Sequence, residues 1–81
     1  MSDLSTLHDE IAPILPDCYY SEIDDDMIYI GSIDSEFSRL DIFHQGGGRF
    51  ELEFNGVAGI WGRMYMNHDE IVTAISNNCD F

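Results

Sequence analysis

The stretch that decides the fold is RFELEFNGVAGIWGRMYM, residues 49–66. Its first six residues alternate charged and apolar side chains, the pattern of a strand with one buried face and one wet face. Asn55-Gly56 follows, and this dipeptide strongly favours a two-residue hairpin turn. Residues 57–66 then form the returning strand. The stretch predicts an antiparallel hairpin, and therefore an antiparallel sheet.

The returning strand of this hairpin carries apolar side chains on both of its faces. Trp61 and Tyr65 project to one side, and Met64 projects to the other. A tight turn places Trp61 on the side of Phe50, whereas a bulged turn exchanges the two faces. The sequence leaves both registers open. In either register the strand is covered on two faces or exposes apolar groups beside carboxylates.

Upstream of the hairpin, short segments with strand character alternate with turn residues. Asp24-Asp25-Asp26 is typical of a turn, because aspartate hydrogen-bonds to its own backbone. The segment 45–48, with its three glycines, precedes a strand rather than a helix, so we interpret it as a hairpin turn rather than a phosphate-binding loop. The strands expected on either side of these turns cover residues 19–23, 27–33 and 37–44.

A helix is expected at each end of the chain. Residues 4–15 repeat apolar side chains at three- and four-residue intervals, and Pro13 should end or kink this helix. Asn67 and Glu70 have the spacing of a capping box that opens a helix running to about Asn77. The sequence thus predicts a single α+β domain over residues 1–81. We expect an antiparallel meander of four to five strands flanked by an N-terminal and a C-terminal helix, both on one face.

Charge is the strongest compositional signal. Sixteen acidic residues stand against three arginines and no lysine, which gives a net charge of −13 and a pI of about 4.1. Nucleic acids and anionic membranes are bound through basic groups, so this composition argues against both as direct partners. A basic protein surface is the expected partner. With a polar N-terminus and no long apolar run, we expect a cytoplasmic protein.

Candidate catalytic and metal-binding groups are few. The triplet His-Asp-Glu occurs twice, at residues 8–10 and 68–70, but consecutive helical residues point about 100° apart and do not converge on one ion. Cys18 and Cys79 are expected to be reduced, partly buried thiols. We therefore expect no catalytic residue, no metal and no cofactor, and we predict that the chain is not an enzyme.

The candidate contact residues are the carboxylates of the predicted hairpins and of the outward strand positions. Carboxylates at alternate strand positions lie about 6.6 Å apart, similar to the spacing of successive phosphates in a nucleic-acid strand. Trp61 and Tyr65, with Met64 as a further candidate, would serve as apolar anchors. The predicted partner-binding residues are Glu22, Asp24, Asp25, Asp26, Asp34, Glu36, Asp41, Glu51, Glu53, Trp61 and Tyr65.

In size, acidity, lack of lysine and compact helix-plus-sheet organisation, the chain resembles small phage-encoded anti-defence proteins, including acidic anti-CRISPR proteins and DNA-mimic inhibitors. The resemblance implies an inhibitor that occupies the basic nucleic-acid-binding surface of a bacterial defence complex. The charge is also compatible with an immunity protein or antitoxin that neutralises a basic toxin. A further alternative is a small structural protein that self-associates, as a homodimer, through its last strand.

Overall fold

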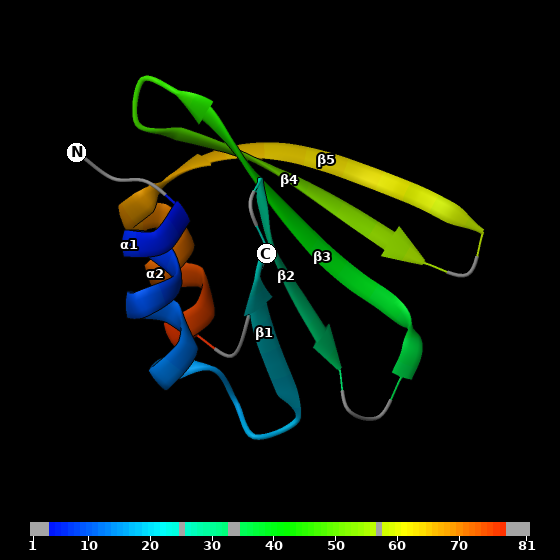
Figure 1. Cartoon of the computed structure of the whole chain (residues 1–81). Coiled ribbons are helices and arrows are strands. Elements are labelled where there is room, and N and C mark those ends of the chain that lie inside the picture. Colours follow the sequence, from blue (N-terminus) through cyan, green and yellow to red (C-terminus); the bar gives the residue numbers. More distant parts are fainter. Residues whose placement is uncertain (1–3, 25, 33–34, 57, 78–81) are drawn as a thin grey trace.

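The computed structural model describes residues 4–24, 26–32, 35–56 and 58–77, without the side chains of residues 35–38 and 61. It consists of a five-stranded antiparallel sheet in the order β1-β2-β3-β4-β5 and two α-helices (Figure 1). The predicted α+β meander is therefore confirmed. The elements are α1 (Leu4–Ile11), the 3-10 turn η1 (Ala12–Ile14), β1 (Tyr19–Ile23), β2 (Met27–Ser32), β3 (Ser35–Gly46), β4 (Arg49–Gly56), β5 (Gly59–Asn67) and α2 (His68–Ser76).

Local sequence signals account for the ends of both helices. The α-helical part of the first helix stops at Ile11 and continues as the 3-10 turn that contains Pro13, as expected from the missing proline N–H. At α2 the predicted capping box is present. The Oδ1 of Asn67 accepts from the backbone N–H of Glu70 at 2.8 Å, and the Glu70 carboxylate accepts from the backbone N–H of Asn67 at 2.9 Å.

Both helices cover the same face of the sheet, which confirms the predicted layering (Figure 1). Leu7 and Ile11 of α1 and Ile71 and Ile75 of α2 are almost completely buried, and they pack against alternate residues of the central strands. Each such burial stabilises the fold by about 1.5–3 kcal/mol before entropy is subtracted. The strand residues of this core are Ile28, Ile30, Leu40, Ile42, Phe50 and Leu52.

The predicted turn at Asn55-Gly56 is wrong. Both residues belong to β4, Gly56 pairs with Gly59, and the connection covers residues 57 and 58, of which 57 lies outside the described residues. The register shifts beside Phe54, which leaves position 61 as the extra residue of a bulge.

The bulge selects which face of β5 joins the core. Met64 lies opposite Leu52, and Met66 lies opposite Phe50, so both methionines point toward the helices. A tight turn would instead have put the guanidinium of Arg63 on the helix-covered face, where burial of a charge is costly. The bulged register is therefore the one that keeps Arg63 outside.

Candidate functional site

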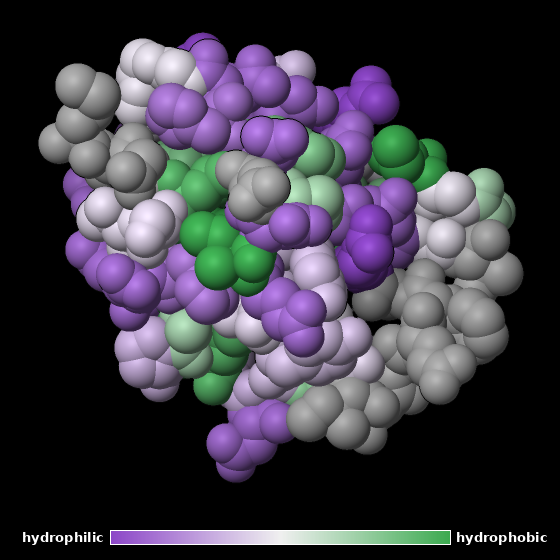
Figure 2. Space-filling view, in the orientation of Figure 1, coloured by the Kyte–Doolittle hydropathy of each residue, from purple (hydrophilic) through white to green (hydrophobic). Residues whose placement is uncertain are grey.

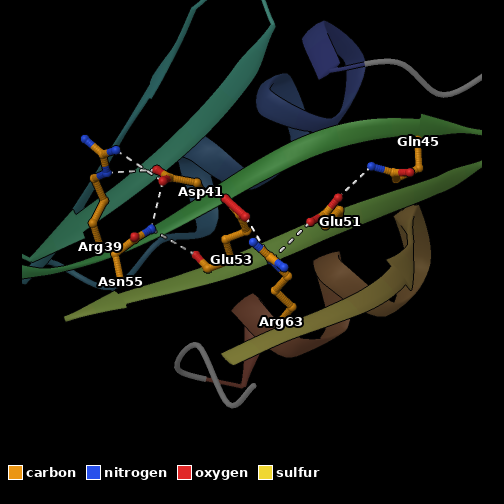
Figure 3. Close-up of polar contacts among 7 residues, drawn as sticks. All are labelled: Arg39, Asp41, Gln45, Glu51, Glu53, Asn55 and Arg63. Atoms are coloured by element: carbon orange, nitrogen blue, oxygen red, sulfur yellow. Dashed lines mark hydrogen bonds and ion pairs between the residues drawn. The ribbon is translucent and has the colours of Figure 1, made fainter. Parts of the chain in front are cut away.

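The face of the sheet opposite the helices carries a network of polar side chains on β3, β4 and β5 (Figure 3). Asp41 is at its centre and is only 5% exposed. Its Oδ2 accepts from Nδ2 of Asn55 at 2.8 Å and from Nη2 of Arg39 at 3.1 Å. Its Oδ1 lies 2.8 Å from Nε of Arg39, in an ion pair without hydrogen-bond geometry. The sequence predicts that Asp41 contacts a partner, but its carboxylate is already enclosed by the chain itself.

Glu51 and Glu53 form the second part of the network. Nε of Arg63 lies 3.0 Å from Oε2 of Glu53 and 3.5 Å from Oε1 of Glu51. Nε2 of Gln45 donates to Glu51 at 2.7 Å. Both carboxylate side chains are less than one-fifth exposed, whereas Arg63 is 56% exposed. These carboxylates point to the open face as predicted, but a partner would meet the arginine before it met them.

This pairing leaves the open face of β3, β4 and β5 close to electrical neutrality. Arg49 shares the alternating outward positions of β4 with Glu51 and Glu53, so all three arginines of the chain lie on this face. They balance the three carboxylates of Asp41, Glu51 and Glu53. Among the other acidic residues whose side chains the structure describes, none lies on β3, β4 or β5. The negative charge available to a partner therefore lies outside this face.

The β1–β2 hairpin carries a group of exposed carboxylates. Glu22, Asp24 and Asp26 are all exposed, and Asp25 between them lies outside the described residues. The hydroxyl of Tyr29 donates to the Glu22 carboxylate. That hydrogen bond, with smaller contributions from desolvation and from the Glu22 charge, raises the pKa of Tyr29 above its usual 10.0. Because the phenol of Tyr29 is neutral, this hydrogen bond adds no positive charge beside Glu22.

A hollow of about 570 Å³ opens beside this hairpin. Aspartates 24 and 26 lie next to aliphatic and aromatic side chains there, and the start of α1 forms another part of the wall. A long side chain with an apolar stem and a cationic end, such as lysine or arginine, suits this combination. The residues that line the hollow are Leu4, Ser5, Ile23, Asp24, Asp26, Phe43 and His44.

The remaining predicted contact residues are scattered. Tyr65 is 57% exposed and lies on the open face opposite Glu51, while Met64 is half-buried on the helix side. Trp61 and Glu36 belong to β5 and β3, but their side chains lie outside the description. Asp25 and Asp34 are outside the described residues altogether. The structure thus brings together Glu22, Asp24 and Asp26 in one place, and Asp41, Glu51 and Glu53 in another.

The two His-Asp-Glu triplets are in contact, which spacing along the chain did not indicate. Nε2 of His68 lies 2.8 Å from Oε2 of Glu10 and ties the start of α2 to α1. Nε2 of His8 instead lies 3.0 Å from the Ser21 hydroxyl. In the described part of the chain, no three His, Cys, Asp or Glu side chains cluster in a way that would hold a metal ion.

Cys18 is a free thiol, as predicted, but it is exposed rather than partly buried. Its position in the turn before β1, outside the packed layers, explains the difference. Cys79 lies outside the described residues.

Comparison with known proteins gives no family for this chain. No family model matches it, and no curated protein or solved structure matches it. Among the described helices, none has the length and apolar character required to span a membrane.

Proposed function

We propose that this chain is a non-enzymatic inhibitor that binds a basic, nucleic-acid-binding surface of a bacterial defence complex in the cytoplasm. The observation that carries the proposal is the hollow beside the β1–β2 hairpin, where Asp24 and Asp26 adjoin the apolar side chains of Ile23 and Phe43. An arginine or lysine of the partner fits there with its stem on the apolar wall and its charge on the carboxylates.

The distribution of charge supports this hairpin, rather than the open sheet face, as the contact. Asp41, Glu51 and Glu53 of β3 and β4 are paired with arginines, so this part of the open face would attract a basic groove only weakly. Exposed carboxylates at Asp9 and Asp17 extend the negative field of the hairpin along the N-terminal part of the chain. A net charge of −13 would speed association with a basic groove, and salt would weaken that attraction.

A two-step binding experiment tests the proposal. The tagged chain is incubated with a bacterial lysate at low salt, and the captured proteins are eluted with salt and identified by mass spectrometry. The proposal predicts a nucleic-acid-binding protein that an added oligonucleotide releases from the chain. Capture of a basic toxin that no oligonucleotide displaces would favour an immunity protein instead. If no nucleic-acid-binding protein is captured, the proposal is wrong.

Charge-reversed variants locate the contact once the partner is purified. Asp24→Lys/Asp26→Lys changes the hairpin, and Asp9→Lys/Asp17→Lys makes the same change in net charge at a different exposed site. We expect the hairpin variant to raise the Kd at least about a hundredfold, because it reverses charges in direct contact with the partner. The control variant should raise the Kd less than about tenfold, through long-range attraction alone. Equal effects of the two variants would contradict the placement of the contact.

A further inference from the structure

The last strand, β5, is an edge of the sheet with few of the features that usually protect an edge. It is nine residues long, and of the described strands only β4 pairs with it. Natural edge strands are protected by charged side chains, above all lysine, by proline, by inward-pointing charges and by bulges. The sequence of β5, GIWGRMYMN, contains no lysine and no proline, its single charged residue, Arg63, points to the open face, and its bulge at position 61 lies toward one end of the strand. Among the described residues, no strand pairs with the outer backbone N–H and C=O groups of β5.

Exposed apolar side chains accompany this edge. Ile60 is 49% exposed and Tyr65 is 57% exposed, both on β5. In the space-filling view most of the visible face is hydrophilic, and hydrophobic atoms reach the surface only in small patches (Figure 2). The bulge at position 61 ends the regular pairing on one side, so Gly62–Asn67 is the regular part of the edge.

We propose that β5 pairs in antiparallel orientation with β5 of a second copy of this chain, which joins the two five-stranded sheets into one of ten strands. This inference does not depend on the proposed function. A pairing with twofold symmetry must keep inner positions opposite inner positions, because a shift of one residue exchanges the faces. Two registers near the middle of the regular segment meet this condition. In one, Met64 pairs with the partner's Met64, and in the other, Tyr65 pairs with the partner's Tyr65.

The Met64-centred register is the one that the side chains favour. It places Arg63 opposite the partner's Tyr65, and by symmetry Tyr65 opposite the partner's Arg63. An arginine beside an aromatic ring is attracted to its face. Met64 then lies opposite the partner's Met64 on the helix side. Centring on Tyr65 would instead put Arg63 opposite the partner's Asn67, without that attraction.

The charge distribution selects a second copy as the occupant of this edge. β5 contains no carboxylate and adjoins the neutral part of the open face, whereas the acidic hairpin ends the sheet at β1. Four strand spacings, about 19 Å, separate the two edges. That distance exceeds the Debye length of about 8 Å at physiological salt. Joining two copies through β5 keeps the acidic hairpins at the far ends of the double sheet, while joining through β1 would bring them together.

Sedimentation equilibrium over a range of protein and salt concentrations tests the pairing. We expect a monomer–dimer equilibrium that strengthens with salt, because salt screens the repulsion between two copies of charge −13. Binding of a basic partner through the hairpin weakens with salt, so the two proposals are separated by the sign of the salt effect. A chain that stays monomeric at all concentrations and salt levels would overturn the pairing.

Two lysine variants identify the edge. Tyr65→Lys places lysine beside Glu51 within the monomer but opposite the partner's Arg63 in the dimer. Tyr20→Lys adds the same charge at an exposed position of β1. We expect Tyr65→Lys to raise the dimer Kd by about tenfold or more, because two symmetric pairs become repulsive. Tyr20→Lys should change the Kd less than about twofold. The reverse order of effects, or no effect of either variant, would refute pairing through β5.

A cysteine introduced on β5 tests the register without relying on a charge change. Met64→Cys, in a chain with Cys18→Ser and Cys79→Ser, puts two thiols opposite each other across the twofold axis. The Cα atoms of such a pair are about 4.5–5.5 Å apart, within the range of a disulfide. We expect a disulfide-linked dimer under mild oxidation, whereas Tyr20→Cys in the same background should give little cross-linked product. Equal cross-linking of the two variants would overturn the inference.

Discussion

Replacement of Asp41 by alanine tests whether this carboxylate holds the sheet together or serves a partner. Asp41 is buried and accepts hydrogen bonds from Arg39 of its own strand, β3, and from Asn55 of the neighbouring strand, β4. Removing it leaves Nδ2 of the half-buried Asn55 with only its longer contact of 3.5 Å to the backbone carbonyl oxygen of Glu53. Arg39 is half-exposed and regains water. The expected loss of stability therefore comes mainly from Asn55 and only in small part from the arginine.

The magnitude follows from these two contacts. A hydrogen bond to a charged group contributes about 1.5–3 kcal/mol. The ion pair with the half-exposed Arg39 adds about 0.2–1 kcal/mol after solvent screening. We expect Asp41→Ala to lower the free energy of unfolding by about 2–4 kcal/mol. A small domain has an m-value near the lower end of about 1–3 kcal/mol/M in urea, so the unfolding midpoint should fall by about 2–4 M.

Urea unfolding followed by circular dichroism measures this change, with Asp9→Ala as the control. Asp9 is exposed on α1, and its replacement removes the same charge with an expected change within about 0.5 kcal/mol. Asp41→Asn keeps one oxygen acceptor and should fall between the two. If Asp41→Ala unfolds at the same urea concentration as the control and instead weakens partner binding, the structural role argued for Asp41 is wrong.

Three further changes probe the helices and the hairpin. Asn67→Ala removes the cap of α2 and should cost about 0.5–2 kcal/mol in the same urea experiment, whereas Asn67→Asp should keep most of the stability. Leu7→Ala empties a completely buried position of α1 and should cost about 2–5 kcal/mol, with the loss seen as a lower thermal midpoint. Glu22→Gln should lower the pKa of Tyr29 toward 10.0, measured by the ultraviolet absorbance of the phenolate. Because the folded pKa is raised, the stability from this contact is present below pH 10 and is lost as the pH rises through the folded pKa.

The parts of the fold that depend on neighbouring residues were predictable from the sequence. The capping box of α2 needs only Asn67 and Glu70, and it forms as expected. The end of α1 before Pro13 depends on one proline. The alternation in residues 49–54 correctly identified the buried face of β4, because period-two patterns report burial directly.

The parts that depend on contacts between distant segments were not predictable in the same way. The position of the turn after β4 depends on whether the register buries Arg63 or buries Met64 and Met66. The turn preference of the dipeptide Asn55-Gly56 carries no information about that burial. In the sequence, nothing distinguishes Asp41 from the other carboxylates at outward strand positions. Its carboxylate accepts a hydrogen bond from Asn55, which lies fourteen positions away in the chain. The contact between Glu10 and His68 spans 58 positions. The hollow combines α1, the β1–β2 hairpin and β3, so no single stretch of sequence encodes it.

The balance of three arginines against the three carboxylates of Asp41, Glu51 and Glu53 also gives the described sheet an electric dipole along its strand order. Its negative pole lies at the β1–β2 hairpin, and its less negative end lies at β5. A charged groove exerts a torque on such a dipole during approach and turns the hairpin toward the groove before contact. The internal ion pairs would therefore reduce the number of encounters in which the wrong side of the chain arrives first.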